Sequence, residues 1–224
     1  MFDITLKMGT AFMLAGPSSC GKSTFVKNLI KYRNVMFNRK IENVYIVCSN
    51  VQSMYQDLVK SGDVTQIFYE MPSKNEVIEI AEIGKRQGGT ILILDDMLSE
   101  IAKNNILIQE IFTEIAHHYD LTVVLCVQNL FVQNSIFRTL SLNCSYLVPF
   151  KHPRDTKQIN FIAYRSYAKN PKLVIEAYND ATRFPYTYLL MDFTQKTPDF
   201  LRLRSNIFPT NMGNSLCTVY LPNE

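Results

Sequence analysis

A run of residues close to the N-terminus has the types and the spacing of a phosphate-binding P-loop, or Walker A motif. The motif is glycine, any four residues, glycine, lysine and then serine or threonine. Its glycines permit backbone torsions that a Cβ would forbid, so several backbone N–H groups can point at one anion. Its lysine can reach the outer phosphates of a nucleotide, and its hydroxyl can bind Mg²⁺. The matching residues are Gly16, Pro17, Ser18, Ser19, Cys20, Gly21, Lys22, Ser23 and Thr24.

The residues on either side predict the strand and the helix that a P-loop requires. Residues 10–15 form a short apolar run that is typical of a buried strand. A helix that begins near Lys22 would point its positive N-terminal dipole at the same anion. Its apolar positions follow at helical spacing and are Phe25, Val26, Leu29 and Ile30. We therefore predict a nucleotide site, with Lys22 catalytic and Ser23 on the metal, rather than an ordinary glycine-rich turn.

Two carboxylates follow a second apolar run and resemble the end of a Walker B strand. Residues 91–94 are apolar and lead directly into Asp95 and Asp96. A buried parallel strand delivers its last side chains to the carboxyl edge of the sheet, where nucleotides bind in such folds. We assign Asp95 to Mg²⁺ and Asp96 to the attacking water, with Glu100 as the alternative base. The competing interpretation is that the two aspartates only cap the turn after a strand.

A polar amide follows the next strand-like run. Residues 121–127 are mostly apolar and stop at Gln128, which could sense the γ-phosphate or orient the water. Asn129 could replace it in this role, and either amide could instead satisfy backbone groups in a turn. A further apolar run, residues 44–48, lies between the P-loop and Asp95. This order is similar to the additional-strand, catalytic-acid division of P-loop proteins, and the absence of an Asn-Lys-x-Asp motif disfavours a GTPase.

Strand-like and helix-like segments alternate along the chain, which predicts an α/β fold with a mainly parallel, RecA-like central sheet flanked by helices. Pro149, near the end of a strand-like run, places that strand near a sheet edge. A C-terminal β-hairpin is predicted at about residues 186–208, and Arg202 and Arg204 alternate with leucines as if on its exposed face. We expect a P-loop ATPase domain over residues 1–209 and a tail over residues 210–224.

Composition limits the partners and the cellular compartment that the sequence predicts. It has 224 residues, 47% of them apolar, and a formal net charge of +3, which neither requires nor excludes a nucleic-acid partner. The five cysteines are widely spaced without a Cys-x-x-Cys pair, which favours a reducing, intracellular setting over a disulfide framework or a zinc site. The N-terminal segment carries Asp3 and runs straight into the P-loop strand, which is unlike a signal peptide, and no apolar stretch is long enough to span a bilayer. We expect no membrane partner.

Eight stretches, taken in order, resemble the genome-packaging ATPases of poxvirus-like, adintovirus and polinton-type DNA viruses, which belong to the FtsK/HerA superfamily of DNA pumps. The most specific stretches are Gln-Asn-Leu, Arg-Thr-Leu-Ser-Leu-Asn and Pro-Arg-Asp. Many relatives have glycine where this chain has Ser19, and the cellular pumps favour Asp-Glu where it has Asp95 and Asp96. The resembling stretches are residues 16–24, 47–49, 94–96, 127–130, 138–143, 151–155, 176–182 and 202–208.

The resemblance implies a homo-oligomeric ring that uses ATP and Mg²⁺ to drive double-stranded DNA into a preformed capsid. It implies a capsid or portal partner and a location in the host cytoplasm or nucleus at virus assembly sites, or in the virion. A ring motor needs a cation that reaches the neighbour's γ-phosphate. The candidates are Arg138 and Arg154, with Arg183 as a third, although each could instead form an ordinary surface ion pair.

DNA contact in such a motor would be made to the phosphate backbone and would be independent of sequence. The candidate cations, each of which could equally be a solvated surface residue, are Lys31, Arg33, Arg39, Lys40 and Lys151. Two other functions stay open. The P-loop could belong to a small-molecule (nucleotide) kinase, or to a scaffold that binds nucleotide without hydrolysing it.

Overall fold

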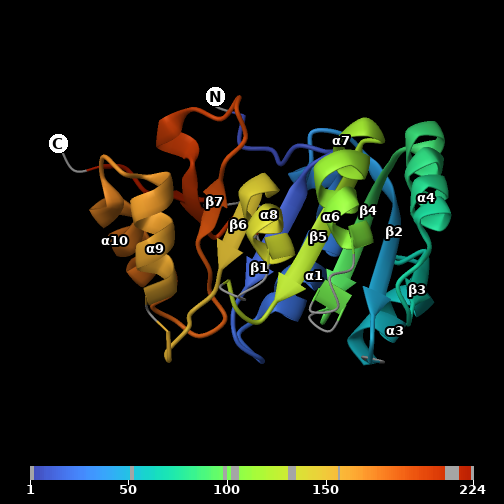
Figure 1. The fold of residues 1–224 in the computed structure, drawn as a ribbon, viewed down its shortest axis with the longest axis horizontal. Coiled ribbons are helices and arrows are strands. Elements are labelled where there is room, and N and C mark those ends of the chain that lie inside the picture. Colours follow the sequence, from blue (N-terminus) through green and yellow to red (C-terminus); the bar gives the residue numbers. More distant parts are fainter. Residues whose placement is uncertain are drawn as a thin grey trace.

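A single sheet contains all the strands of the described part of the chain, in the order β3-β2-β4-β5-β1-β6-β7-β8-β9 (Figure 1). The computed structural model describes residues 3–50, 53–97, 100–101, 106–130, 135–155, 157–209 and 217–222. The strands are β1 (Ala11–Ala15), β2 (Ile41–Cys48), β3 (Gln66–Phe68), β4 (Gly89–Asp95), β5 (Leu121–Val127), β6 (Tyr146–Pro149), β7 (Leu190–Asp192), β8 (Leu203–Ser205) and β9 (Thr218–Val219).

In this order, the neighbouring strands β3, β2, β4, β5, β1 and β6 pair in parallel. The pairs β6–β7, β7–β8 and β8–β9 are antiparallel. The predicted α/β class with a mainly parallel sheet is therefore confirmed. Strand β5 lies between β1 and β4, with Val123 opposite both Ala11 and Leu92. Strands β1, β4 and β5 are apolar and buried almost throughout, because helices cover both faces of the sheet.

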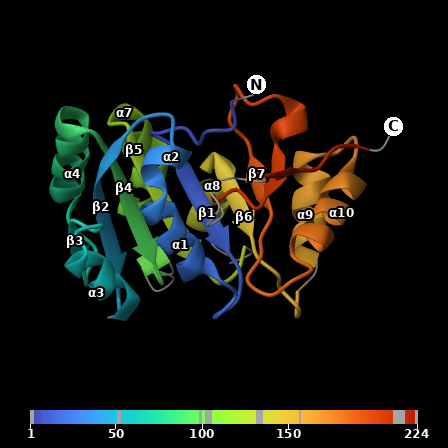
Figure 2. The ribbon, with the colours of Figure 1, turned by 180° about the vertical axis from the view of Figure 1, so that it is seen from behind.

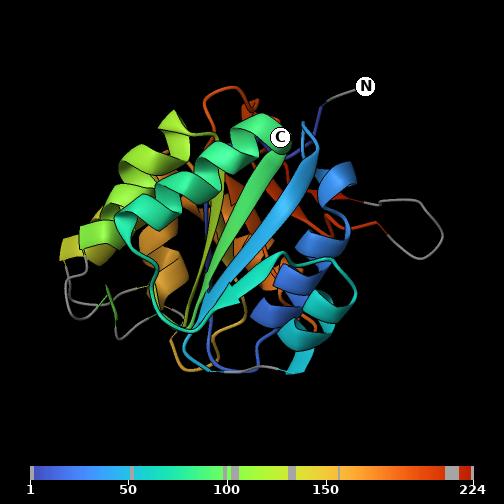
Figure 3. The same cartoon turned by 90° about the vertical axis from the view of Figure 1, so that its right-hand side faces the viewer.

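The two faces of the sheet are covered by different sets of helices (Figures 2 and 3). On one face pack α1 (Lys22–Lys31), α2 (Arg33–Met36) and α3 (Ser53–Lys60). On the other face pack α4 (Lys74–Gln87), α6 (Ile106–Glu110), η1 (Ile111–Ile115), α7 (Ala116–His118), α8 (Ser135–Asn143), α9 (Lys157–Ser166) and α10 (Pro171–Ala181). Element η1 is a π-helical turn between α6 and α7.

Local signals account for where two of these helices begin. The Ser73 hydroxyl accepts a bond from the Glu76 N–H, and the Glu76 carboxylate accepts one from the Ser73 N–H, which together form a capping box at α4. The Asn170 side chain caps α10, where Pro171 occupies the first turn. Both helix starts agree with the sequence pattern.

The prediction that the strand with Pro149 lies near an edge is wrong. Strand β6 lies inside the sheet, parallel to β1 on one side and antiparallel to β7 on the other. Pro149 is the last residue of β6 and lies beyond the pair that Leu147 forms with Met191. Its carbonyl still accepts a hydrogen bond from the Leu189 N–H at 3.2 Å, so the backbone keeps a bond to the segment before β7 although the proline lacks an N–H.

The predicted C-terminal hairpin is present as the antiparallel pair β7–β8, which are joined through a loop with the short 3₁₀ helix η2 (Asp199–Leu201). Its strands are shorter than the alternation suggested. Thr218 and Val219, from the segment expected to be a tail, pair with β8 as β9. The domain boundary at residue 209 stays a prediction.

The expectation that Arg204 lies on an exposed face is wrong. Its side chain is 3% exposed, and its guanidinium contacts the carboxylate of Asp192 at 2.6 Å and the carbonyl of Ile4 at 2.9 Å. The Asp192 carboxylate also accepts bonds from Thr194 and Thr197. Arg202 remains nearer the surface, beside the exposed Asp199. The two arginines therefore differ because Arg204 lies within β8, whose residues are all buried, whereas Arg202 lies before the strand, at the end of η2.

Candidate active site

The P-loop takes the shape that its glycines predict. It links the end of β1 to the first residue of α1, and Gly21 has a φ of 114°. A Cβ on Gly16 would lie 2.7 Å from Cys20 Sγ and 2.8 Å from Phe150 Cβ, so only glycine fits there. The Gly16 N–H donates to the carbonyl of Val127 at 3.1 Å, which fixes the start of the loop to the end of β5.

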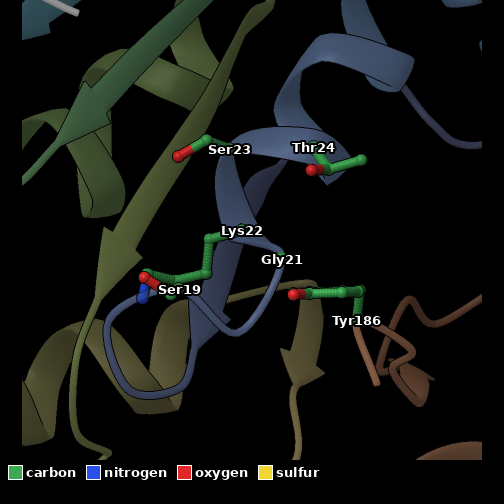
Figure 4. A pocket seen from close by; sticks show the side chains of 6 residues that line it. All are labelled: Ser19, Gly21, Lys22, Ser23, Thr24 and Tyr186. Atoms are coloured by element: carbon green, nitrogen blue, oxygen red, sulfur yellow. The ribbon is translucent and has the colours of Figure 1, made fainter. Parts of the chain in front are cut away.

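The ammonium of Lys22 lies inside the curve of the loop. Its Nζ donates to the carbonyl oxygens of Gly16 at 2.5 Å and Pro17 at 2.9 Å. A pocket of about 220 Å³ opens over the loop and the first turn of α1 (Figure 4). It is lined by Ser19, Gly21, Lys22, Ser23, Thr24 and Tyr186. A cation, hydroxyls and the N-terminus of α1 therefore face one cavity, which is a chemistry suited to phosphate.

Asp95 ends β4 at the same edge of the sheet and is 6% exposed. Its carboxylate accepts a hydrogen bond of 2.6 Å from the Tyr55 hydroxyl of α3. Burial and the neighbouring charge of Asp95 raise the pKa of Tyr55 far above its usual range, so the hydroxyl keeps its proton and remains a donor. Tyr55 was missed from the sequence, where it reads only as an apolar position of a short helix.

The register of the sheet brings Gln128 and the acidic pair to the edge that carries the P-loop. Val127 lies opposite Ala15, the residue before the loop, and Cys126 lies opposite Asp95. Gln128 follows directly and is exposed, as is Asp96, whose φ is 58°. Glu100 is half-buried. The structure thus gathers the predicted residues at one edge, while their individual catalytic roles stay predictions.

Two solved structures are similar to this chain in fold. The chain is similar to the genome packaging NTPase B204 from Sulfolobus turreted icosahedral virus 2, determined in complex with ATP-gammaS, with a TM-score of 0.54 and 17% identity over 95% of this chain and 97% of that chain. It is also similar to a KaiC-like protein from Pyrococcus horikoshii OT3, with a TM-score of 0.53 and 12% identity over 96% and 90% of the two chains. This is the fold of the RecA-like P-loop NTPases.

No family model matches the sequence, and no curated protein is significantly similar to it. Over the part of the chain that the structure describes, none of the helices of this P-loop NTPase fold has the length and apolar character to cross a membrane. Within the same residues, no group of three or more His, Cys, Asp or Glu side chains is placed to hold a metal ion.

The arginines proposed from the sequence lie on exposed positions. Arg138 is in the first turns of α8, and Arg154 is in the turn that follows β6. Both follow strands that end at the P-loop edge. The Arg183 guanidinium lies over the ring of Phe184, 4.8 Å from its centroid. Their contribution to a neighbouring subunit stays a prediction.

The basic residues proposed to contact DNA differ in the contacts that their side chains make. Arg33 is half-buried and donates to the carbonyls of Ile30 and Ile41 at 2.7 and 3.1 Å, so it joins the end of α1 to the start of β2. Arg39 is bridged to Asp120 at 3.0 Å, and Lys40 is bridged to Glu42. The remaining two candidates, Lys31 and Lys151, are exposed. The bonds of Arg33 favour a structural role for that residue.

Proposed function

We propose that this protein is a Mg²⁺-dependent ATPase that translocates double-stranded DNA and packages a viral genome into a capsid. The observation that carries the ATPase part is the position of β5 between β1 and β4. This order brings the P-loop, Asp95 and Gln128 to one edge of the sheet. Hydrolysis needs a group beside the phosphates that can act on water, and this arrangement supplies acidic and amide side chains there.

The residues present fit a nucleotide and a metal. The crowding at Gly16 leaves no room for a side chain at that position of the loop, and the pocket is open beside Lys22 and Ser23. Ser23 and Asp95 would hold Mg²⁺ together with the phosphates of the nucleotide, since hydroxyl and carboxylate oxygens are the kind of ligand that Mg²⁺ takes. Bound Mg²⁺ neutralises charge on the phosphates. Tyr55 orients Asp95 through its hydrogen bond and holds the carboxylate at the end of β4.

The attacking water is assigned to the side chains that follow the two strands. Asp96 or Glu100 accepts its proton, and Gln128 orients it by hydrogen bonds. Lys22, released from the carbonyls of Gly16 and Pro17, binds the outer phosphates. Each of these steps uses residues that lie at the carboxyl edge of the sheet.

DNA packaging is the more specific part of the proposal. It is supported by the resemblance at residues 138–143 and 151–155, and by the similarity of nearly the whole chain to B204, a genome packaging NTPase. In a homo-oligomeric ring at the site of virus assembly, Arg138 or Arg154 would reach the nucleotide of the adjacent subunit. Exposed cations such as Lys31 or Lys151 would contact the DNA backbone, and a capsid or portal component would hold the ring.

The test is the ATPase rate as a function of protein concentration, with and without double-stranded DNA, at low and at raised salt. We expect a rate that rises steeply with concentration, increases with DNA and loses the DNA effect as salt increases. Lys22→Ala and Asp95→Ala are each expected to abolish turnover. Phosphate release that needs an added nucleoside monophosphate, and ignores DNA, would replace the motor by a kinase. Tight ATP binding without phosphate release would replace it by a scaffold.

A further inference from the structure

A large aromatic ring stands beside the P-loop, although nothing in the loop motif requires it. Tyr186 lines the pocket over the loop, and its side chain reaches the loop from the C-terminal part of the chain (Figure 4). Tyr186 is 67% exposed, whereas tyrosines in folded proteins are usually at least half-buried. A Cβ added to Gly21 would lie 3.2 Å from both Cα and Cβ of Tyr186, so Tyr186 lies close against the loop and leaves little room for a side chain at Gly21.

The backbone around Tyr186 is held on both sides. The Thr187 hydroxyl donates to the Phe184 carbonyl at 2.7 Å and closes the turn. Tyr188 forms a bridge with Phe150, directly after β6, and its ring packs edge-on against Phe25 of α1 at 4.8 Å between centroids. The segment is therefore fastened both to the sheet and to the helix that begins at the P-loop, and the ring is held over the pocket by anchored backbone.

Tyr186 also has a backbone conformation that tyrosine rarely adopts. Its φ is 64°, in the left-handed region, which costs a residue with a Cβ about 1–2 kcal/mol. Such strain persists where surrounding contacts impose it, and it clusters at ligand sites. Here the imposed conformation leaves a ring uncovered beside a phosphate-binding loop.

The position of the ring within the pocket indicates which part of a nucleotide it would meet. A P-loop lysine reaches the β- and γ-phosphates, so the outer phosphates lie toward Lys22. In Figure 4, Lys22 and Ser19 lie toward one side of the pocket, and Thr24 and Tyr186 lie toward the other. The nucleoside therefore extends toward Tyr186.

We propose that the ring of Tyr186 is the surface on which the base of the bound nucleoside triphosphate stacks. The inference rests on the proposed nucleotide site and assigns that site a contact for the base. A ring face suits a base because stacking uses the π-face of the heterocycle and needs no hydrogen bond to its edge. The P-loop binds the phosphates, and Tyr186 binds the other end of the same ligand.

The absence of tryptophan from the sequence makes a direct test possible. In the variant Tyr186→Trp the single indole reports on the pocket alone. We expect ATP to quench its fluorescence in a saturable manner, because the base stacks on the indole. Inorganic tripolyphosphate, which has no base, should compete with ATP and reverse the quenching. Saturable binding of ATP, measured by calorimetry, with no change in fluorescence would overturn the proposal.

A truncation series separates the base contact from the phosphate contacts. Tyr186→Ala should weaken ATP binding by about 5- to 150-fold, and should change tripolyphosphate binding less than twofold. Tyr186→Phe keeps the ring and should retain the affinity for ATP. Phe184→Ala removes a neighbouring exposed ring that does not line the pocket, and should leave both affinities unchanged.

Three outcomes decide between the base contact and the site as a whole. Equal losses for ATP and tripolyphosphate in Tyr186→Ala would overturn the base contact, because the residue would then only shape the loop. Equal affinity of the wild-type protein for both ligands would overturn it as well, and would leave the phosphate site intact. Failure of the wild-type protein to bind either ligand would overturn the nucleotide site itself. Thermal unfolding of each variant identifies any loss that comes from misfolding, for which Tyr186→Phe and Tyr186→Trp remain as tests.

Discussion

A tyrosine holds the carboxylate of Asp95. The Tyr55 hydroxyl donates to it at 2.6 Å, and both side chains are buried. A hydrogen bond to a charged group contributes more than a neutral one, about 1.5–3 kcal/mol. Burial and the charge of Asp95 raise the pKa of Tyr55 far above its usual range, so the hydroxyl keeps its proton and remains a donor. The carboxylate proposed to bind the metal is thus positioned by a neutral hydrogen-bond donor.

Tyr55→Phe tests this arrangement. We expect the free energy of unfolding to fall by about 1–3 kcal/mol, because a buried carboxylate loses one hydrogen-bond donor, and we expect kcat of ATP hydrolysis to fall as well. Urea unfolding and steady-state ATPase assays measure the two effects. Tyr146→Phe is the control, since a buried tyrosine there loses a partly buried bond from the Lys7 N–H at 3.0 Å and does not line the P-loop pocket. A Tyr55→Phe protein with unchanged kcat would remove Tyr55 from the mechanism.

Residues of the site were predictable where chemistry requires them at fixed spacing. The P-loop and Asp95 could be found because phosphate binding prescribes glycine, lysine and hydroxyl positions, and because a carboxylate ends a buried strand. Tyr55 and Tyr186 could not be found, since each meets the site through packing between segments far apart in the sequence. Only the fold brings α3 to the end of β4 and the loop before β7 to Gly21.

At the level of elements, the sequence pattern predicted where strands and helices occur more reliably than which elements pack against them. The alternation around Arg204 predicts a strand, and β8 is there. Alternation of polar and apolar residues identifies an exposed face only if solvent lies on one side of the strand. Strand β8 instead lies between β7 and β9, has α10 packed nearby, and is buried at all of its residues. The arginine is therefore buried and paired. The order of strands could not be predicted from propensity, which describes single segments. Strands β6 and β7 pair in the sheet although α9 and α10 separate them in the sequence.

Arg204→Ala tests the buried ion pair. It leaves the carboxylate of Asp192 buried without its cation, so we expect the free energy of unfolding to fall by about 3–5 kcal/mol in urea titrations. Arg86→Ala is the control, because Arg86 and its partner Glu82 are both exposed and the loss should stay near 1 kcal/mol or below. Similar losses in the two variants would contradict the buried, paired state of Arg204.

Gly84 tests how tightly α4 packs on the sheet. Alanine is ordinarily better than glycine inside a helix by about 1 kcal/mol. Here a Cβ would overlap Thr90 Oγ1 of β4, and would lie 2.9 Å from Thr90 Cβ and 3.1 Å from its backbone nitrogen. We expect Gly84→Ala to destabilise the protein by about 1–3 kcal/mol, measured by thermal or urea unfolding. Glu79→Ala, on the exposed face of the same helix, should change stability by less than about 0.5 kcal/mol.

At the scale of the whole molecule, the proposed ring requires that one subunit complete the site of the next. Arg138 and Arg154 are exposed and follow the strands whose ends carry the P-loop edge. An exposed cation near a nucleotide edge is available to a neighbour, whereas Lys22 acts within its own chain. The two kinds of residue therefore predict different behaviour when mutant subunits are mixed.

We expect Arg138→Ala or Arg154→Ala to abolish ATP hydrolysis by disabling a neighbouring subunit. Mixing such a variant with Lys22→Ala should restore part of the turnover, because some interfaces then combine an intact P-loop with an intact arginine. ATPase rates measured across mixing ratios provide the test, with each variant alone as the control. A lack of rescue for both arginines would exclude them as residues that act in trans.

The position of β1 also affects how the chain is made. Its two neighbours in the sheet are β5 and β6, which lie far along the sequence, while β2, β3 and β4 pair among themselves. At ribosomal rates, on the order of ten seconds of synthesis separate β1 from the strands that flank it. During that interval an apolar strand and the loop behind it have no sheet to join. Strand β1 is thus made before both of its neighbours and reaches its final shape only after they have emerged, so the nascent chain has to be protected from aggregation during that interval.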